Sequence, residues 1–552
     1  MSPPSVLSVR QLSVAFAQEG ERLLAVDQVS FEIGPGECFA LVGESGSGKS
    51  VTALSVLRLL PPNGRILEGS VRLHGTELLS LPEKRMSAVR GGKIGIVFQD
   101  PMTALNPVMT LGQQLAESLR LHGSLTGQAM RQRALDLLHQ VGLPKPSRHL
   151  DEYPHQLSGG MRQRAMIALA LAGEPELLIA DEPTTALDVT LQAQILALLH
   201  RLRQETGMAL WLITHDFGTV AEIADRVAVM QSGSLVETSD RTFFTGPRHP
   251  YSQTLLSAMP RLDACLSRPR RIAPAVTAAP LLEVRDLRVY YPIRRGIFQR
   301  TVDQVRAVDG VSFTLHRGET LALVGESGCG KTTLGKALLG LAPWTSGKVA
   351  LAGVPVPNRA GSREGAGLQV VFQDPFASMN PRMLIGPLLE EGLRAQQPKL
   401  STEDRQTRVA ALLAAVGLPL SARDRYPHEF SGGQRQRLCI ARALAVEPAV
   451  LICDEPTSAL DVSVQAQVIR LLKTLQQQHG LSYLFITHDL AVVSELADRV
   501  AVMQAGRIVE TGDTRQILFE PQHPYTRHLL AALPRLHRER AGIGAAADNE
   551  RP

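Results

Sequence analysis

The chain repeats itself once along its length, and this repeat constrains the fold more than any other feature. Six short motifs occur in the same order in both halves. The copies are 282 residues apart at Lys49 and Lys331, and 273 or 274 residues apart at every later motif. A chain of 552 residues is also too long for one hydrophobic core. The repeat therefore predicts two similar domains.

The repeat also sets the expected domain limits. We predict a first domain over residues 1–262 and a second over residues 281–540, which differ mainly by a short insertion before the second glycine loop and a deletion after it. Residues 263–280 are rich in Pro, Ala and Arg without a sustained period, which is typical of a linker. Residues 541–552 are expected to be a disordered tail.

Within each copy, strand-like runs alternate with helix-like runs. The segments ECFALVG (37–43), ELLIAD (176–181) and MALWLITHD (208–216) are short and apolar, as buried parallel strands are. Residues 49–60 show the apolar spacing of a helix. This alternation predicts an α/β fold with a mainly parallel sheet flanked by helices. In such sheets ligands bind where the strands end, and the motifs follow the strand ends.

A glycine-rich phosphate loop occurs in each copy, GESGSGKS at 43–50 and GESGCGKT at 325–332. The glycines let several backbone N–H groups and a helix N-terminus point at a phosphate, the lysine adds a charge, and the final hydroxyl can bind Mg²⁺. Two such loops, each between a strand and a helix, predict two nucleotide sites. The expected nucleotide-binding residues are Gly43, Ser45, Gly46, Gly48, Lys49, Ser50, Gly325, Ser327, Gly328, Gly330, Lys331 and Thr332.

An acidic pair follows a buried strand in each copy, within ELLIADEPTTALD (176–188) and AVLICDEPTSALD (449–461). The position of Asp181 and Asp454 beside the phosphate loop suits the Mg²⁺ that bridges two phosphates. Glu182 and Glu455, the next residues, stand where a carboxylate can polarise an attacking water.

Both halves resemble the nucleotide-binding domain of ABC transporters along nearly the whole chain. LSGGM (157–161) and FSGGQ (430–434) are similar to the ABC signature, VFQDP to the Q-loop and ITHD to the switch histidine. The resemblance implies two tandem P-loop ATPase domains, each a RecA-like core with an α-helical subdomain, that use ATP and Mg²⁺. It implies catalytic roles for Gln99, Glu182, His215, Gln373, Glu455 and His488, and Mg²⁺ ligands among Ser50, Gln99, Asp181, Thr332, Gln373 and Asp454.

The Ser-Gly-Gly segment of each copy starts a helix in this interpretation. Ser158 and Ser431 are good N-cap residues, so the N–H groups that follow form a positive end. The resemblance implies that this end binds the ATP of the opposite domain. The loop of Lys49 would be closed by Ser431, Gly432 and Gly433, and the loop of Lys331 by Ser158, Gly159 and Gly160. Neither half is then expected to work alone.

Both sites are expected to be competent, because no catalytic position is altered in either copy. Met161 replaces the commoner Gln of the signature, beyond its serine and glycines. The family often stacks adenine on an aromatic residue near the end of an early strand, where Phe16 and Tyr291 occur, with Tyr290 as a competing choice in the second copy. Cys329 inside the second loop has no catalytic reason to be there; we expect a thiol reagent to inhibit and ATP to protect.

Two further repeated features narrow the family. PMTALNP (101–107) and PFASMNP (375–381) follow the Q-loops, and HPYSQTLLSAMP (249–260) and HPYTRHLLAALP (523–534) end the domains. These resemble ATP-binding subunits of dipeptide and oligopeptide importers, including fused forms for glutathione or microcin-type peptides. The resemblance implies two transmembrane permease subunits, a periplasmic or extracellular substrate-binding protein, and a place at the cytoplasmic face of a bacterial inner membrane.

Composition limits the remaining alternatives. No run of about 18 apolar residues occurs, so partners would have to span the membrane. A net charge of +5 and only 4% aromatic residues give no indication of a nucleic-acid partner. The five cysteines form no C-x-x-C pair, which is typical of reduced thiols. A twin ATPase of translation or regulation remains the alternative class, and nickel or opines the alternative cargoes of an importer.

Overall fold

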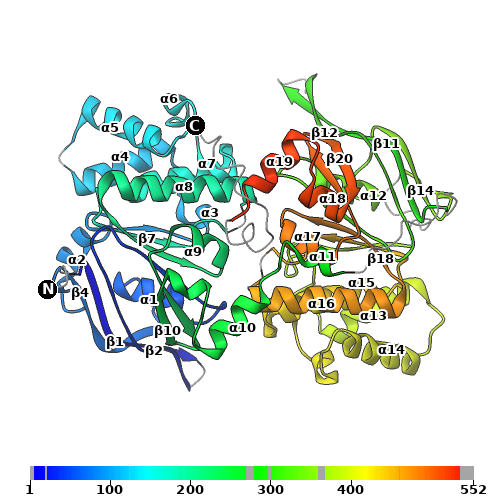
Figure 1. Cartoon of the computed structure of the whole chain (residues 1–552), viewed down its shortest axis with the longest axis horizontal. Coiled ribbons are helices and arrows are strands. Elements are labelled where there is room, and N and C mark those ends of the chain that lie inside the picture. The colour runs from blue at the N-terminus through cyan, green and yellow to red at the C-terminus, as the bar shows by residue number, and fades with distance from the viewer. Residues whose placement is uncertain are drawn as a thin grey trace. The chain divides into compact units, whose positions relative to one another are not determined.

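The computed structural model describes residues 5–18, 21–123, 125–185, 187–268, 279–295, 300–358, 367–458 and 460–534. The chain forms two compact units (Figure 1). The first consists mainly of residues 1–187 and 191–258, and the second mainly of residues 259–533. The expected tail, 541–552, and residues 269–278 of the expected linker lie outside the described residues.

The first unit contains a six-stranded, mainly parallel sheet. Its order is β10(Ser234–Asp240), β9(Arg226–Gln231), β3(Cys38–Val42), β8(Ala209–Thr214), β7(Leu177–Asp181), β6(Ile94–Val97), and only β9 and β10 pair antiparallel. Every residue of β3, β7 and β8 is buried, as their apolar sequences predict. The carboxyl ends of the parallel strands share one edge, which gathers the residues that follow them.

The second unit repeats this sheet. Its order is β16(Leu368–Val371), β17(Val450–Asp454), β18(Ser482–Thr487), β13(Thr320–Val324), β19(Arg499–Gln504), β20(Arg507–Asp513), and again only the last pair is antiparallel. The predicted α/β class with a mainly parallel sheet in each of two tandem domains is confirmed.

A second, antiparallel sheet lies in each unit and was not predicted. In the first unit its order is β2(Glu21–Ile33), β1(Leu7–Gln18), β4(Gly64–Leu73), β5(Thr76–Glu77), and in the second β12(Arg300–Leu315), β11(Leu282–Arg295), β14(Ser346–Leu351), β15(Val354–Pro355). Aromatic packing joins the two sheets of the first unit, because the Phe31 ring of β2 lies 5.0 Å from the rings of both Phe39 in β3 and Trp211 in β8.

Helices connect the parallel strands, and a subset forms a separate layer in each unit. Figure 1 shows α4, α5 and α7 together in the first unit and α13, α14 and α15 together in the second, which are the helical subdomains that the resemblance implied. The helices of the first unit are α1(Lys49–Val56), α2(Glu83–Val89), α3(Pro101–Ala104), α4(Leu111–His122), α5(Gly127–Gln140), α6(Pro146–His149), α7(Gly159–Leu171), α8(Val189–Thr206), α9(Phe217–Ile223) and α10(Pro250–Ala258). Those of the second are α11(Ala264–Ser267), α12(Lys331–Leu338), α13(Ile385–Gln396), α14(Thr402–Ala415), α15(Gly432–Leu444), α16(Val462–His479), α17(Leu490–Leu496), α18(Thr514–Phe519) and α19(Pro524–Ala531).

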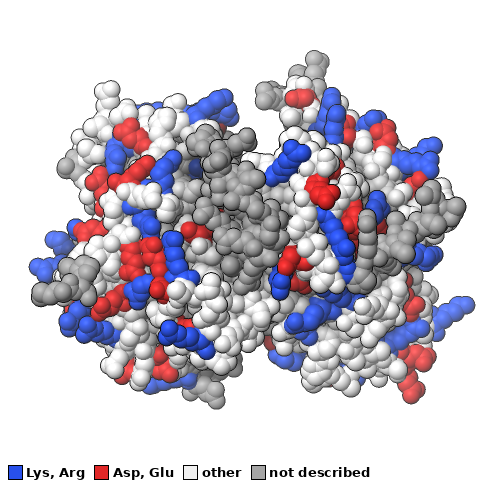
Figure 2. All heavy atoms as spheres, in the orientation of Figure 1, with Lys and Arg blue, Asp and Glu red and all other residues white. Residues whose placement is uncertain are grey.

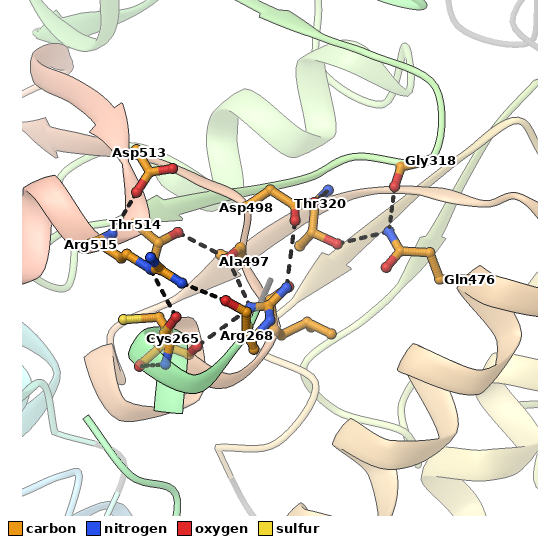
Figure 3. Close-up of polar contacts among 12 residues, drawn as sticks. Cys265, Arg268, Gly318, Thr320, Gln476, Ala497, Asp498, Asp513, Thr514 and Arg515 are labelled. Atoms are coloured by element: carbon orange, nitrogen blue, oxygen red, sulfur yellow. Dashed lines mark hydrogen bonds and ion pairs between the residues drawn. The ribbon is translucent and has the colours of Figure 1, made fainter. Parts of the chain in front are cut away.

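Residues 261–268, which we call the docked segment, belong to the second unit and pack against α17 and α18 (Figure 3). Cys265 of α11 is only 4% exposed, and its N–H donates to Ser494 Oγ at 3.0 Å. The Arg515 guanidinium donates to the carbonyl oxygens of Cys265 (3.0 Å), Leu266 (3.4 Å) and Arg268. Residues 263–268 of this segment lie within the predicted linker, 263–280, and a specific side chain binds their backbone carbonyls.

Arg268, at the end of the docked segment, in turn binds the C-terminal end of α17. Its guanidinium donates to the carbonyl oxygens of Ser494 (3.4 Å), Leu496 (3.3 Å) and Ala497 (3.0 Å) at the end of α17. It also lies 3.5 Å from Asp498, and Figure 3 shows its contacts with Ala497 and Asp498. The last carbonyls of a helix have no partner within the helix, and a cation there also complements the helix dipole. The docked segment is therefore held from both sides.

The surface carries charges of both signs. In Figure 2, Lys and Arg are scattered among Asp and Glu over the visible face of each unit. Among the described helices, none combines the length and the apolar character that a membrane span requires.

Candidate functional site

Each phosphate loop joins the central strand of its sheet to a helix, β3 to α1 and β13 to α12. Gly48 and Gly330, the N-cap residues, have φ of 103° and 108°, which favours glycine. A Cβ there would lie 2.4 Å from Ala25 O or 2.0 Å from Ala307 O. These loops therefore require glycine for both backbone conformation and space, and the helix that follows begins with backbone N–H groups of the kind that bind an anion.

The loop lysines are folded back onto their own loops. Lys49 is 5% exposed, and its Nζ donates to the carbonyl oxygens of Gly43 and Glu44, both at 2.8 Å. Lys331 makes the equivalent bonds in the second unit, to Gly325 O at 2.7 Å and Glu326 O at 2.8 Å. The ammonium groups are thus already inside the loops where a phosphate would bind. Ser45, Gly46, Ser327 and Gly328 form the exposed part of the loops.

The predicted Mg²⁺ ligands meet at the edge of each parallel sheet. Ser50 Oγ donates to Asp181 Oδ1 at 3.0 Å, and Thr332 Oγ1 donates to Asp454 Oδ1 at 3.1 Å. Burial raises the pKa of the Asp181 carboxyl to about 6 and raises the pKa of Asp454 as well. A buried carboxylate beside a hydroxyl fits Mg²⁺, which prefers oxygen ligands and takes few of them from the protein when phosphates are also bound.

The adjacent glutamate is held by three side chains in the first unit. Glu182 accepts hydrogen bonds from Gln99 Nε2 (2.6 Å), Thr185 Oγ1 (2.9 Å) and His215 Nδ1 (3.0 Å). Burial alone would raise the pKa of Glu182, but the hydrogen bond and charge of His215 lower it to about 2. The carboxylate is therefore ionised and oriented, as a group that aligns a water must be.

The second unit places the same groups in the same arrangement. Glu455 accepts from Gln373 Nε2 at 2.9 Å and from His488 Nδ1 at 3.3 Å. Burial opposes ionisation of Glu455, but His488 keeps its pKa below the ordinary value, and Glu455 in turn raises the pKa of His488. At the position of Thr185 the second copy has Ser458, whose Oγ donates to the backbone carbonyl of Glu455 at 3.1 Å.

Both glutamates have a backbone conformation that is uncommon for residues other than glycine. The φ angle is 47° at Glu182 and at Glu455. Their N–H groups donate to the neighbouring strand, to Ile213 O at 2.8 Å and to Ile486 O at 2.9 Å. This pairing holds a strained conformation that turns the carboxylate towards the glutamine and the histidine, and such strain is often found at functional positions.

The predicted signature residues stand at helix starts. Ser158 is the N-cap of α7 and accepts from Met161 N–H, and Ser431 is the N-cap of α15 and accepts from Gln434 N–H, both at 3.4 Å. Gln434 also accepts from Ser431 N–H at 3.1 Å, which completes a capping box that Met161 has no side-chain acceptor to form.

The signature glycines fit against the next long helix. A Cβ at Gly160 would lie 3.1 Å from the Leu191 side chain, and one at Gly433 would lie 2.2 Å from Val464 Cγ1. Gly159 and Gly432, one residue earlier, are exposed.

The two predicted adenine-stacking residues lie in the antiparallel sheets. Phe16 is half-buried near the end of β1, and its ring lies so close to Gly64 that a Cβ there would be 2.8 Å from Cε1. Tyr291 of β11 is 42% exposed and pairs with Val305 of β12. Tyr290 instead donates through its hydroxyl to Asp309 Oδ1 at 2.6 Å.

Sequence reasoning missed some contacts of the site. It assigned no role to Thr185, although the hydroxyl bonds Glu182. It also used the two HPY segments only as family markers, whereas Tyr251 and Tyr525 reach the second residue of each phosphate loop. The recurrence of HPY at one place in both repeats was a signal that could have indicated such a role.

Comparison with known protein families matches both repeats. The family model described as ABC transporter matches residues 26–185 and 308–458. A second family model, described as oligopeptide/dipeptide transporter, C-terminal region, matches residues 236–281 and 509–551. The chain belongs to the ABC transporter family. Within it, the second match makes this an ATP-binding protein of the oligopeptide/dipeptide importer type.

Curated relatives match nearly the whole chain. The peptidoglycan transport ATP-binding protein YejF of Agrobacterium fabrum is 51% identical over 96% of each chain. The glutathione import ATP-binding protein GsiA of Escherichia coli is 48% identical over 96% of this chain and 90% of the relative. An uncharacterized ABC transporter ATP-binding protein, YejF of Escherichia coli, is 50% identical over 96% and 99%.

As an ABC importer ATPase, the chain binds and hydrolyses ATP in a reaction coupled to transport. Importers of this type imply permease partners in the membrane.

Proposed function

We propose that this chain energises the import of small peptides through two transmembrane permeases at the cytoplasmic face of a bacterial inner membrane, with cargo delivered by a periplasmic or extracellular binding protein. Two HPY regions of the oligopeptide/dipeptide type support a peptide cargo. One relative is named for glutathione import and another for peptidoglycan transport, which favours short or unusual peptides as the cargo. Glutathione is the more specific candidate for this cargo.

Two composite ATP sites are the core of the proposal. The loop of Lys49 would be completed by the helix that begins after Ser431, and the loop of Lys331 by the helix that begins after Ser158. Each serine side chain caps its own helix, so the backbone N–H groups of the glycines that follow remain at a positive helix end. Such an end binds phosphate well. ATP bound in this way would hold the two halves together until hydrolysis.

At each site Glu182 or Glu455 would align the attacking water and accept its proton. The network that carries this proposal is the ionised glutamate held by a glutamine and a histidine, Gln99 with His215 or Gln373 with His488. Mg²⁺, which would be held by Ser50 with Asp181 and by Thr332 with Asp454, neutralises charge on the phosphates when bound. The histidine, on the other side of the glutamate, would stabilise the transferring phosphoryl group.

The role of the glutamates is tested by Glu182→Gln and Glu455→Gln in the full chain. Each variant should reduce ATP turnover at its own site by about 10² to 10⁴, the usual contribution of a positioned base. Glu403→Gln, an exposed glutamate of α14, is the control and should leave turnover unchanged. A large asymmetry between the two site variants would refute two equivalent sites.

The cargo is tested by uptake in the native bacterium after deletion of this chain. Complementation with the unmodified chain should restore uptake of labelled glutathione or dipeptides, and the double variant Glu182→Gln with Glu455→Gln should not. Loss and recovery of nickel uptake with normal peptide uptake would contradict a peptide cargo. ATP turnover stimulated by ribosomes and indifferent to any permease would contradict transport itself.

A further inference from the structure

The HPY motif of the first repeat forms a fixed turn at the start of α10. Glu237 of β10 accepts hydrogen bonds from the backbone N–H groups of Arg248 (2.8 Å) and His249 (3.0 Å). His249 Nδ1 accepts from the N–H of Tyr251 at 3.3 Å. These three bonds fix the direction in which α10 begins, and therefore the side chain of Tyr251 as well.

Tyr251 reaches the phosphate loop of its own unit. Its hydroxyl donates to Glu44 Oε2 at 3.0 Å across 207 residues of sequence. Glu44 is the second residue of the loop, and its carbonyl oxygen accepts from Lys49 Nζ at 2.8 Å. A single residue therefore connects the tyrosine to the lysine that binds phosphate.

The second repeat makes the same connection through a different atom. Glu510 of β20 accepts from the N–H groups of Gln522 (2.8 Å) and His523 (3.2 Å), which fixes the start of α19. Tyr525, 8% exposed, accepts from the backbone N–H of Glu326 at 3.1 Å. Glu326 O in turn accepts from Lys331 Nζ at 2.8 Å.

The two copies thus differ in chemistry but agree in place. Tyr251 donates a hydrogen bond to a side-chain carboxylate, and Tyr525 accepts one from a backbone N–H. Both nevertheless contact the second residue of the phosphate loop. A tyrosine that served only to pack its helix would need some partner for its hydroxyl, but not this partner in both copies. The shared feature is the loop residue whose carbonyl holds the lysine.

We propose that Tyr251 and Tyr525 are positioning residues of the phosphate loops, through which the C-terminal HPY helix of each unit sets that unit's affinity for ATP. The inference rests on the proposed use of both loops for ATP. It links a segment outside the nucleotide-binding motifs to the nucleotide, and gives the HPY tyrosine a task in the ATPase cycle.

The first site can be isolated in the full chain by Lys331→Ala, which disables the other loop. In that parent, Tyr251→Phe removes only the hydroxyl and should raise the Kd for ATP about three- to tenfold. This is less than a hydrogen bond to a charged group contributes in full, because the hydroxyl acts on the nucleotide only through Glu44. The kcat at saturating ATP should change by less than about twofold, since no catalytic group is moved. Glu44→Ala should raise the Kd similarly, and the double variant should be no worse than either single variant.

The second site, isolated by Lys49→Ala, gives a different pattern. Tyr525→Phe should again raise the Kd. Glu326→Ala keeps the backbone N–H, so the effect of Tyr525→Phe should persist in full in the Glu326→Ala background. The effects of the two substitutions should therefore be coupled for Tyr251 and Glu44 and additive for Tyr525 and Glu326. This difference follows from the atoms that form each bond, a side-chain carboxylate in the first unit and a backbone N–H in the second.

A matched control separates positioning from general stability. Tyr483→Phe removes another buried tyrosine hydroxyl, which donates to Leu472 O at 2.8 Å, and should lower Tm without altering the Kd. An unaltered Kd for ATP in Tyr251→Phe and Tyr525→Phe would overturn this inference but not the proposed function. The same would follow if Tyr251→Phe raised the Kd equally in the parent and in the Glu44→Ala background. Failure of the unmodified chain to bind ATP would overturn the proposed function together with it.

Discussion

Replacing Arg515 with Thr should release the docked segment from α17 and α18 of the second unit. Thr242 occupies the equivalent position of the first repeat, so the variant gives the second copy the residue of the first. It removes the donors to the carbonyl oxygens of Cys265, Leu266 and Arg268. The bonds from Ser494 and Arg268 remain.

The size of the effect follows from those bonds. Hydrogen bonds from a charged group contribute about 1.5–3 kcal/mol each when fully formed, and Arg515 is only partly buried, so we take about 2–4 kcal/mol for the set. Because 1.4 kcal/mol is a factor of ten, opening of the segment should become about 30- to 700-fold more frequent. Cys265 is 4% exposed and can react only when the segment opens, so its alkylation rate should rise by the same factor.

The assay is alkylation of the folded full chain, resolved for each cysteine by mass spectrometry. Cys453, fully buried in β17, is the internal reference and should react equally slowly in parent and variant. Arg507→Thr removes a two-bond ion pair with Asp309 elsewhere in the second unit and should leave the Cys265 rate unchanged. A Cys265 rate in folded Arg515→Thr that stays at the parent value would refute the reasoning.

Three further outcomes are expected. Gly433→Ala should lower the free energy of unfolding by about 1–3 kcal/mol through overpacking. The loss should exceed that of Gly160→Ala, because the new Cβ would come closer to the next helix. Denaturation midpoints would test this, and equal losses would contradict it. Met161→Gln should add about 0.3–1.5 kcal/mol by completing the capping box, and a lower Tm would contradict this. Cys329 should react slowly with thiol reagents, since it is 8% exposed and burial raises its pKa, and more slowly still with ATP; modification indifferent to ATP would place the thiol away from the nucleotide.

Local pattern was enough to predict the parallel strands and the helix starts. Three apolar runs became β3, β7 and β8 because their residues are buried on both faces, and Ser158 and Ser431 became N-caps because their side chains accept backbone N–H groups. The tandem α/β fold follows from these runs and the repeat.

Contacts between distant residues could not be predicted in the same way. The left-handed conformation of Glu182 depends on a bond to a neighbouring strand, and the Tyr251 to Glu44 bond joins residues 207 positions apart. Most of the docked segment lies in the predicted linker, and its binding place depends on Ser494 and Arg515, which come more than 200 residues later in the chain. The strands of the antiparallel sheets, such as β4, are only partly buried and lack the continuous apolar runs that indicated the parallel strands.

The domain limits and the assignment of individual site residues stay predictions. The geometry supports the grouping of loop lysine, Mg²⁺ ligands, glutamate, glutamine and histidine within each unit. The proposed stacking of adenine on Phe16 and Tyr291 involves the nucleotide itself, so no contact within the protein indicates it.

The most direct test of the account is ATP retention by two double variants of the full chain. Lys49→Ala with Ser431→Arg would damage one composite site twice and leave the other whole, so this variant should still retain ATP at the site of Lys331. Lys49→Ala with Ser158→Arg would damage each site once, so it should retain none. Equal retention by the two double variants, or the reverse order, would contradict sites that are shared between the halves.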